Sequence, residues 1–170
     1  MQPRWPNFWL LGASRDLKSL SSEGVTATKA DNLADVVAWD AVIIGRRRPI
    51  DHAYWAQYEQ GVALSLNRNH VRVGYAYARM HSPTALRNPD AATLRPIGVR
   101  DRADSASGVA AVVAWAAERA PNVRFSLPGP HPALRALLEA GMHITETEIF
   151  LSTDPVALDP HRYVTSGDQL

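Results

Sequence analysis

The stretch that decides the fold lies near the middle of the chain and reads Ile97-Gly98-Val99-Arg100-Asp101-Arg102-Ala103-Asp104-Ser105-Ala106-Ser107-Gly108-Val109-Ala110. Its apolar start predicts the end of a strand, its charged centre predicts a loop, and its small residues predict the first turns of an apolar helix. In a loop of this kind several backbone N–H groups point to one place beside the positive end of the helix dipole, which makes a potential phosphate-binding site. Small residues at a helix start also serve packing and capping, so both interpretations stand at this point.

Size and composition narrow the class of protein. The 170 residues fit one domain, which can bury about two-thirds of its unfolded surface. With 18 basic and 17 acidic residues the net charge is +1, so no global field draws the chain to nucleic acid or to a membrane, and neither partner is expected. The absence of cysteine excludes disulfides, thiolate nucleophiles and cysteine zinc sites, and it favours a cytoplasmic location.

No segment has the features of a membrane span or a secretion signal. The longest early apolar run, from Phe8 to Leu11, is shorter than the roughly seven residues that a signal peptide needs, and export by that route is not expected. No run approaches the roughly 18 apolar residues of a spanning helix.

The pattern of polar and apolar residues divides the chain into three parts. Residues 1–23 open with aromatic and proline side chains and predict an arm, which must cover an apolar surface of its own domain or of a neighbouring subunit. Residues 24–153 predict one α+β domain, and residues 154–170 predict a loosely held tail. If the arm crosses to another subunit, it is a candidate for the contact of a homodimer.

The expected elements of the domain follow from periodicity and from turn residues. They are a strand over 25–30, a helix from an Asp31 cap to Gly45, a short helix over 50–60, hairpin strands over 61–66 and 71–80, a surface loop over 81–92, a strand over 93–100, a helix over 105–120, a strand over 123–127, a helix from Pro132 to Gly141, and a strand over 144–153.

This order of elements, together with local sequence, resembles the GNAT N-acetyltransferase superfamily over residues 24–153. The resemblance is carried by Val73-Gly74-Tyr75-Ala76, Ile97-Gly98-Val99, Phe125-Ser126-Leu127-Pro128-Gly129 and Ala133-Leu134-Arg135-Ala136-Leu137-Leu138-Glu139-Ala140-Gly141-Met142. The arginine turn before Asp51-His52-Ala53-Tyr54-Trp55 further resembles the C-terminal half of tandem-GNAT proteins.

The resemblance implies a fold, a cofactor and a reaction. The fold is a three-layer α+β arrangement, a mixed but mostly antiparallel central sheet with helices on both faces and one splayed parallel strand pair. Acetyl-CoA would be the acyl donor, its pantetheine paired with Ile97, Gly98 and Val99 in the gap between those strands. Its pyrophosphate would sit on the helix start, which comprises Ser105, Ala106, Ser107, Gly108, Val109 and Ala110. Direct attack by an amine of a small molecule or peptide would complete the acetyl transfer, with the Val99 N–H polarising the thioester carbonyl.

Two positions depart from the family pattern. Ser105 stands where the phosphate loop usually carries Gln or Arg, and it is a candidate cap for the helix instead. Arg100 or Arg102 could supply the missing positive charge, although neither aligns with the family position. Leu137 stands where many members carry a tyrosine that protonates the departing thiolate, and loss of such an acid costs about 10²–10⁴ in rate. These departures motivate the alternative of a catalytically degenerate domain that acts as a ligand-binding or subunit-interaction module.

Few other side chains suggest chemistry, and no catalytic base is assigned. Tyr75 and Tyr77, or Glu146 and Glu148, could line an acceptor pocket, although alternation on strands also predicts one buried aromatic face and one solvated charged face. Arg46, Arg47 and Arg48 could select an acidic acceptor or simply form a solvated corner. The six histidines have no metal-ligand spacing, and no metal is expected. His131 could lie beside the nucleotide or serve a rigid helix entry.

Overall fold

A mixed sheet organises the protein, whose computed structural model describes residues 2–80, 89–153 and 158–165. Its strands are β1 (Gln2–Ala13), β2 (Val25–Lys29), β3 (Val62–Arg68), β4 (Val71–Arg79), β5 (Ala91–Val99), β6 (Asn122–Pro128), β7 (His143–Ser152) and β8 (Tyr163–Val164). The order across the sheet is β2-β3-β4-β5-β6-β1-β7, and β8 pairs with β5. Among the described strands, β5 and β6 run parallel to each other, and the other neighbouring pairs are antiparallel.

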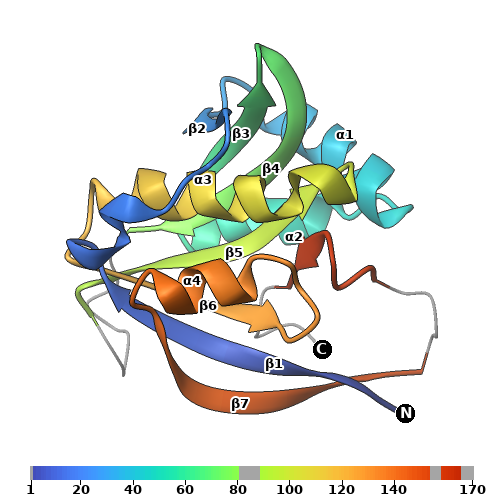
Figure 1. The fold of residues 1–170 in the computed structure, drawn as a ribbon. Helices are drawn as coiled ribbons and strands as arrows, with labels where there is room; N and C mark the ends of the chain where they lie inside the picture. Colours follow the sequence, from blue (N-terminus) through green and yellow to red (C-terminus); the bar gives the residue numbers. More distant parts are fainter. Residues whose placement is uncertain (1, 81–88, 154–157, 166–170) are drawn as a thin grey trace.

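Helices cover both faces of this sheet (Figure 1). They are α1 (Leu33–Ile44), α2 (Pro49–Ala53) with the π-helical turn η2 (Tyr54–Tyr58), α3 (Ser105–Ala117) and α4 (Leu134–Glu139), besides the short 3₁₀ turns η1 (Asp16–Ser19) and η3 (Arg102–Asp104). α3 and α4 lie on one face, whereas α1 and α2 lie on the other. The three-layer α+β prediction is therefore confirmed. None of the helices in the described part of the chain is long and apolar enough to cross a membrane.

Local sequence explains where α1 begins and ends. The Asn32 side chain accepts a hydrogen bond of 2.8 Å from the Ala34 N–H and caps the first turn, one residue after the predicted Asp31 cap. Gly45 ends the helix with a φ of 77°, a left-handed conformation that glycine adopts without steric cost. The predicted hairpin is also present, because Asn69 and His70 both take positive φ values between β3 and β4.

The parallel pair diverges after its first three residues, as predicted. β5 pairs with β6 only from Ala91–Thr93 to Asn122–Arg124. Just beyond, Arg95 and Pro96 of β5 stand opposite a single residue of β4, which makes a β-bulge. A bulge bends its strand, and Pro96 offers no N–H to a neighbour, so β5 turns away from β6 at this point.

The first strand corrects the predicted N-terminal arm. Residues 2–13 form β1, which lies between β6 and β7 and pairs with both. Leu10 is fully buried and Trp9 is 5% exposed, so this segment covers apolar surface inside its own sheet. Because β1 pairs with strands more than a hundred residues away, local sequence carried no sign of its position.

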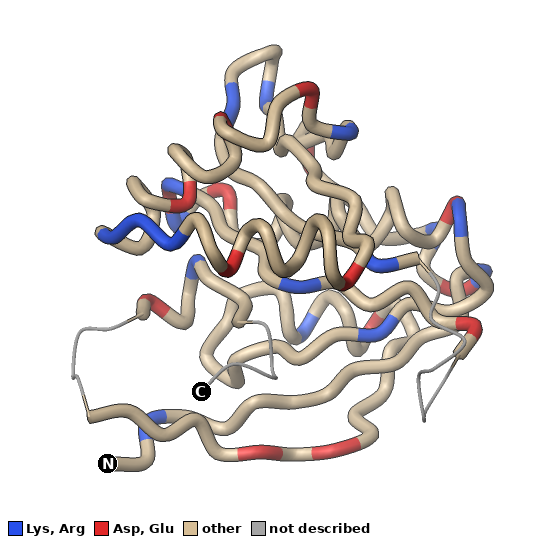
Figure 2. Tube along the Cα trace, turned by 180° about the vertical axis from the view of Figure 1, so that it is seen from behind, with Lys and Arg blue, Asp and Glu red and all other residues tan. Residues whose placement is uncertain are grey.

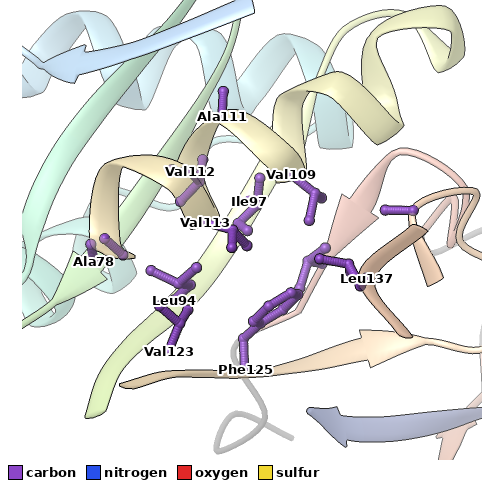
Figure 3. Close-up of a cluster of buried hydrophobic side chains, with 14 of the residues drawn as sticks. Ala78, Leu94, Ile97, Val109, Ala111, Val112, Val113, Val123, Phe125 and Leu137 are labelled. Carbon is purple, nitrogen blue, oxygen red and sulfur yellow. The ribbon is translucent and has the colours of Figure 1, made fainter. Parts of the chain in front are cut away.

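The main core fills the space between the sheet and the helices α3 and α4 (Figure 3). Leu94 and Ile97 of β5 contribute to it from the sheet, Val113 from α3 and Leu137 from α4, and each is at most 1% exposed. The helices expected over 105–120 and from Pro132 to Gly141 thus contribute apolar side chains to the core, whereas Leu138 of α4 is 38% exposed. Burial of each such side chain contributes about 1.5–3 kcal/mol.

Candidate functional site

The gap between the splayed strands is the first candidate site, and the chain's own C-terminal segment lies against its β5 edge. Tyr163 pairs with Gly98 and Val164 pairs with Ile97, antiparallel to β5. The Val99 N–H donates a 3.1 Å hydrogen bond to the carbonyl oxygen of Arg162. In Figure 1 the short red strand β8 lies beside the end of β5. The backbone groups predicted to bind pantetheine are therefore engaged by protein.

Arg162 fastens this segment to two other elements. Its Nη1 donates to the Arg100 carbonyl at 2.8 Å, and its Nη2 donates to the Ile43 carbonyl at 3.1 Å. Ile43 belongs to the last turn of α1, where the helix dipole favours a cation. Asp159 completes the attachment, since its carboxylate lies 3.3 Å from Arg162 and 2.8 Å from Arg102. The segment predicted as a loose tail is thus held at residues 159–164.

A second group of side chains, which we call the Asp40 cluster, lies beneath β8. It joins two residues of α1 and α2, three tyrosines of the sheet and the arginine of the turn between the helices: Asp40, His52, Tyr75, Tyr77, Tyr163 and Arg48. The side chains of Asp40 and His52 are fully buried, and that of Arg48 is 14% exposed. The three tyrosines are at most 3% exposed.

Asp40 is the centre of the cluster and accepts hydrogen bonds from three partners. Arg48 donates to both carboxylate oxygens, with Nε 2.7 Å from Oδ2 and Nη2 2.9 Å from Oδ1. The His52 Nε2 lies 2.9 Å from Oδ2, and the Tyr75 hydroxyl donates to Oδ1. The other His52 ring nitrogen, Nδ1, lies 2.8 Å from the Tyr77 hydroxyl. Every polar group of this buried site thus has a partner, as burial requires.

The electrostatics follow from these contacts. Burial alone would raise the pKa of Asp40, but the hydrogen bonds from His52, Arg48 and Tyr75 outweigh it and lower the pKa to about 2. Burial alone would lower the pKa of Arg48, but its hydrogen bonds to Asp40 raise that pKa instead. Burial raises the pKa of Tyr75 and Tyr163. The cluster therefore holds the Arg48–Asp40 ion pair and undissociated phenols at neutral pH.

Tyr163 links the cluster to β8. Its hydroxyl accepts a hydrogen bond from Arg48 Nη2, and its ring centroid lies 5.4 Å from the guanidinium carbon. Room for the ring comes from Gly98, because a Cβ there would lie 3.2 Å from Tyr163 Cδ2 and 3.0 Å from Tyr75 Cε1. The C-terminal segment is consequently packed into the core as well as paired with the sheet.

The predicted acceptor-pocket residues have other surroundings. Tyr75 and Tyr77 form the buried aromatic face that alternation also allowed, and Arg48 pairs with Asp40 in place of facing solvent. The sequence reasoning did not identify Asp40, His52 or Tyr163. A signal existed for Asp40, since it lies four residues from Val36 and Ile44 on the apolar stripe of α1, where a charged side chain requires a partner.

The second candidate site is the predicted phosphate-binding site, which lies at the start of α3. Ser105 is 1% exposed and its hydroxyl has no hydrogen-bond partner, while the N-cap residue is Asp104. Asp104 accepts from Arg68 at 2.8 Å, and the Ser107 hydroxyl lies 3.5 Å from the Glu23 carboxylate. The predicted Ser105 cap is therefore absent. Two carboxylates, those of Asp104 and Glu23, lie near the helix start and bond to Arg68 and to the Ser107 hydroxyl.

The small residues of this predicted phosphate-binding site take part in close packing. A Cβ on Gly108 would lie 2.8 Å from Val99 Cγ1, so glycine allows α3 to approach β5. Val109 is 1% exposed in the core. Ala106 and Ala110 border a cavity of about 80 Å³ that Leu137 also lines. The predicted phosphate-binding site thus lies next to Leu137 and to the end of β5.

Arg102 and His131 are also engaged with protein. Arg102 pairs with Asp159, as described above. His131 is 3% exposed and its Nδ1 accepts from the Ala133 N–H at 3.2 Å, which fits a helix entry. Burial, reinforced by the nearby His161, lowers the pKa of His131 to about 4. No group of three potential metal ligands occurs among the residues that the structure describes.

Comparison with solved structures identifies the fold. A GCN5-related N-acetyltransferase from Anabaena variabilis superposes with a TM-score of 0.63 at 9% identity, covering 87% of this chain and 40% of that one. The chain has the GNAT fold. A GCN5-related N-acetyltransferase from Kribbella flavida gives a TM-score of 0.54 at 15% identity, covering 87% of this chain and 58% of that one. A conserved protein of unknown function from Staphylococcus epidermidis gives a TM-score of 0.55 at 14% identity, covering 84% of this chain and 59% of that one.

The comparisons extend no further than the fold. The chain spans about 40 to 60% of the length of these three structures. No family model and no curated protein matches the sequence. The narrower resemblance to one half of tandem-GNAT proteins stays a prediction.

Proposed function

We propose that this GNAT-fold domain is a catalytically degenerate interaction module that does not use acetyl-CoA. The observation that supports the proposal is the pairing of β8 with β5, which engages the backbone of Ile97, Gly98 and the Val99 N–H. Those groups are the ones through which the GNAT resemblance implies recognition of the acyl donor. The residues present therefore do not fit the cofactor.

The energetic cost of opening the gap supports the same proposal. A pantetheine arm could pair with β5 only after Tyr163 and Val164 had left their sites, and both are at most 3% exposed. Re-exposing two such side chains costs about 3–6 kcal/mol. A cost of that size weakens the apparent affinity for acyl-CoA by a factor of about 10²–10⁴. The bonds of Arg162 add to this cost.

Among the described residues, neither the position of the usual tyrosine nor the two tyrosines of β4 offers a free phenol to protonate a departing thiolate. Leu137 stands at the position of the usual tyrosine and is 1% exposed within the core. Tyr75 and Tyr77 are buried and engaged with Asp40 and His52. Burial raises the pKa of both phenols, which makes them weaker acids.

Calorimetric titration and a thiol-release assay test this function on the full chain. We expect no heat of binding with acetyl-CoA at millimolar concentration, and no free thiol above the blank against a panel of amines and peptide N-termini. Binding of acetyl-CoA accompanied by thiol release with any amine would overturn the proposal.

An acetyl-CoA-dependent N-acyltransferase is the second candidate, favoured by the GNAT fold and by the buried, unpartnered Ser105 hydroxyl at the start of α3. This candidate requires β8 to leave the gap. Tyr163→Ala would then increase thiol release, because it removes the side chain that holds β8 in place. An inactive but folded Tyr163→Ala protein favours the interaction module.

A further inference from the structure

The outermost strand, β7, offers a long edge for pairing. It has 10 residues, lies at the end of the sheet order and pairs with β1 on its inner side (Figure 1). No strand lies on its outer side within the part of the chain that the structure describes. Natural edge strands are usually short, covered or interrupted, because an exposed edge invites pairing with another chain.

The side chains of β7 give this edge two distinct faces. Thr147, Ile149 and Leu151 alternate on the face that carries Phe8 and Pro6 of β1. Ile149 is 55% exposed and Leu151 is 38% exposed, so the apolar face remains open to solvent. This places exposed apolar groups directly beside the unpaired edge.

The opposite face of β7 is acidic. Glu146 and Glu148 alternate there with Phe150, whose ring stacks on Trp5 at 4.7 Å. Glu146 lies 3.9 Å from Arg124 of β6, so Glu148 is the carboxylate through which this face meets a partner. The acidic positions of the outermost strand appear red in Figure 2. A strand added beside β7 would place its own residues opposite these carboxylates, where opposite charges stabilise a strand pair.

We propose that the β7 edge binds an extended segment of another protein in which basic and apolar residues alternate. Backbone hydrogen bonds to β7 would supply affinity, and the two faces would supply specificity. A basic side chain would lie beside Glu148, and apolar side chains beside Ile149 and Leu151. The surface is separate from the β5–β6 gap, so the inference does not depend on the proposed function.

Charge disfavours two of the registers in which a second copy of this chain could pair with β7. Antiparallel self-pairing of β7 centred on Thr147 would set Glu146 of one copy opposite Glu148 of the other. Centring on Glu148 would set that residue opposite itself. Like charges directly opposite each other destabilise a strand pair.

Fluorescence anisotropy with a defined peptide tests this surface. The probe is a fluorescein-labelled peptide as long as β7 that alternates Lys and Val, titrated with the full chain. We expect saturable binding that Ile149→Lys and Glu148→Lys each weaken by about tenfold or more. Ile50→Lys is the matched control, because Ile50 is 82% exposed on α2, and it should leave the affinity unchanged.

Two further peptides and a check of folding complete the test. A Glu–Val peptide and a Lys–Val peptide methylated on alternate backbone nitrogens should bind at least about tenfold more weakly, because one lacks the charge and the other lacks half of the N–H donors. Unchanged thermal melting of the variants shows that they are folded. Equal binding of all variants, equal binding of the methylated peptide, or a concentration-dependent dimer that Ile149→Lys abolishes would overturn the proposal.

Discussion

Replacement of Tyr163 by alanine should remove a large part of the folding free energy. The ring is 3% exposed, lies against Arg48 and pairs its backbone with Gly98. Truncating a buried aromatic side chain costs about 3–5 kcal/mol through lost burial and the cavity left behind. Loss of the hydroxyl that accepts from Arg48 adds to this. A domain of this size has a total stability of about 5–15 kcal/mol, so the variant should be marginal.

Urea denaturation followed by tryptophan fluorescence measures this effect. We expect a fall in unfolding free energy of at least about 3 kcal/mol and a fall in Tm on the order of 10 °C. Tyr163→Phe keeps the ring and should lose only about 1.5–3 kcal/mol, the value of a hydrogen bond to a charged group. Tyr58→Ala is the control, because Tyr58 is 78% exposed; its ring stacks on Tyr54, and its loss should change stability by less than about 1.5 kcal/mol. If Tyr163→Ala is as mild as the control, then β8 is not part of the core and the reasoning fails.

Three other predictions concern the groups around β5 and α4. The folded-state pKa of His131 is lowered to about 4 from an ordinary value of 6.5. The contribution of neutral His131 to the free energy of unfolding is therefore fully present above pH 6.5 and should fall by about 3 kcal/mol as the pH drops toward 4. Urea titrations across this pH range should show that decrease, and His131→Asn should remove most of it. Asp40→Asn leaves Arg48 buried without its carboxylate and should cost about 3–5 kcal/mol by chemical denaturation, with a cost below about 1 kcal/mol speaking against the cluster. Gly98→Ala sets a Cβ 3.0 Å from the Tyr75 ring and 3.2 Å from the Tyr163 ring, so thermal melting should show a loss of about 1–3 kcal/mol, and an unchanged Tm would mean that the rings are not packed there.

Local patterns predicted most of the domain. The stretch from Ile97 to Ala110 contains both a strand end and a helix start, and each depends on neighbours within a few residues. The apolar stripe that places Leu137 in the core likewise repeats at helical spacing. These signals were sufficient for the order of elements, whereas the splayed strand pair was implied by the resemblance to the GNAT superfamily.

The position of β8 was not readable from sequence. A strand of two residues has no periodicity, and it follows a proline-containing segment that is typical of a tail. Its partner, β5, lies more than sixty residues earlier in the chain, and such pairing is set by tertiary contacts. For the same reason the sequence predicted an arm where β1 joins the sheet.

For the candidate site, the sequence predicted the course of the backbone but not the side chains that contact it. The loop and the helix start were found, but the contacts that engage them come from Glu23, Arg68 and Arg162, which are distant in sequence. The Asp40 cluster was only partly visible, since a buried aspartate signals a missing partner without identifying it. Knowledge of that partner depended on the fold.

Amide hydrogen exchange at Val99, followed by NMR with and without acetyl-CoA, tests the central claim most directly. Because this N–H donates to the Arg162 carbonyl within a buried strand pair, we predict slow exchange and no change in its resonance at millimolar acetyl-CoA. Exchange as fast as that of an exposed surface amide, or a resonance that moves on titration with acetyl-CoA, would contradict the account.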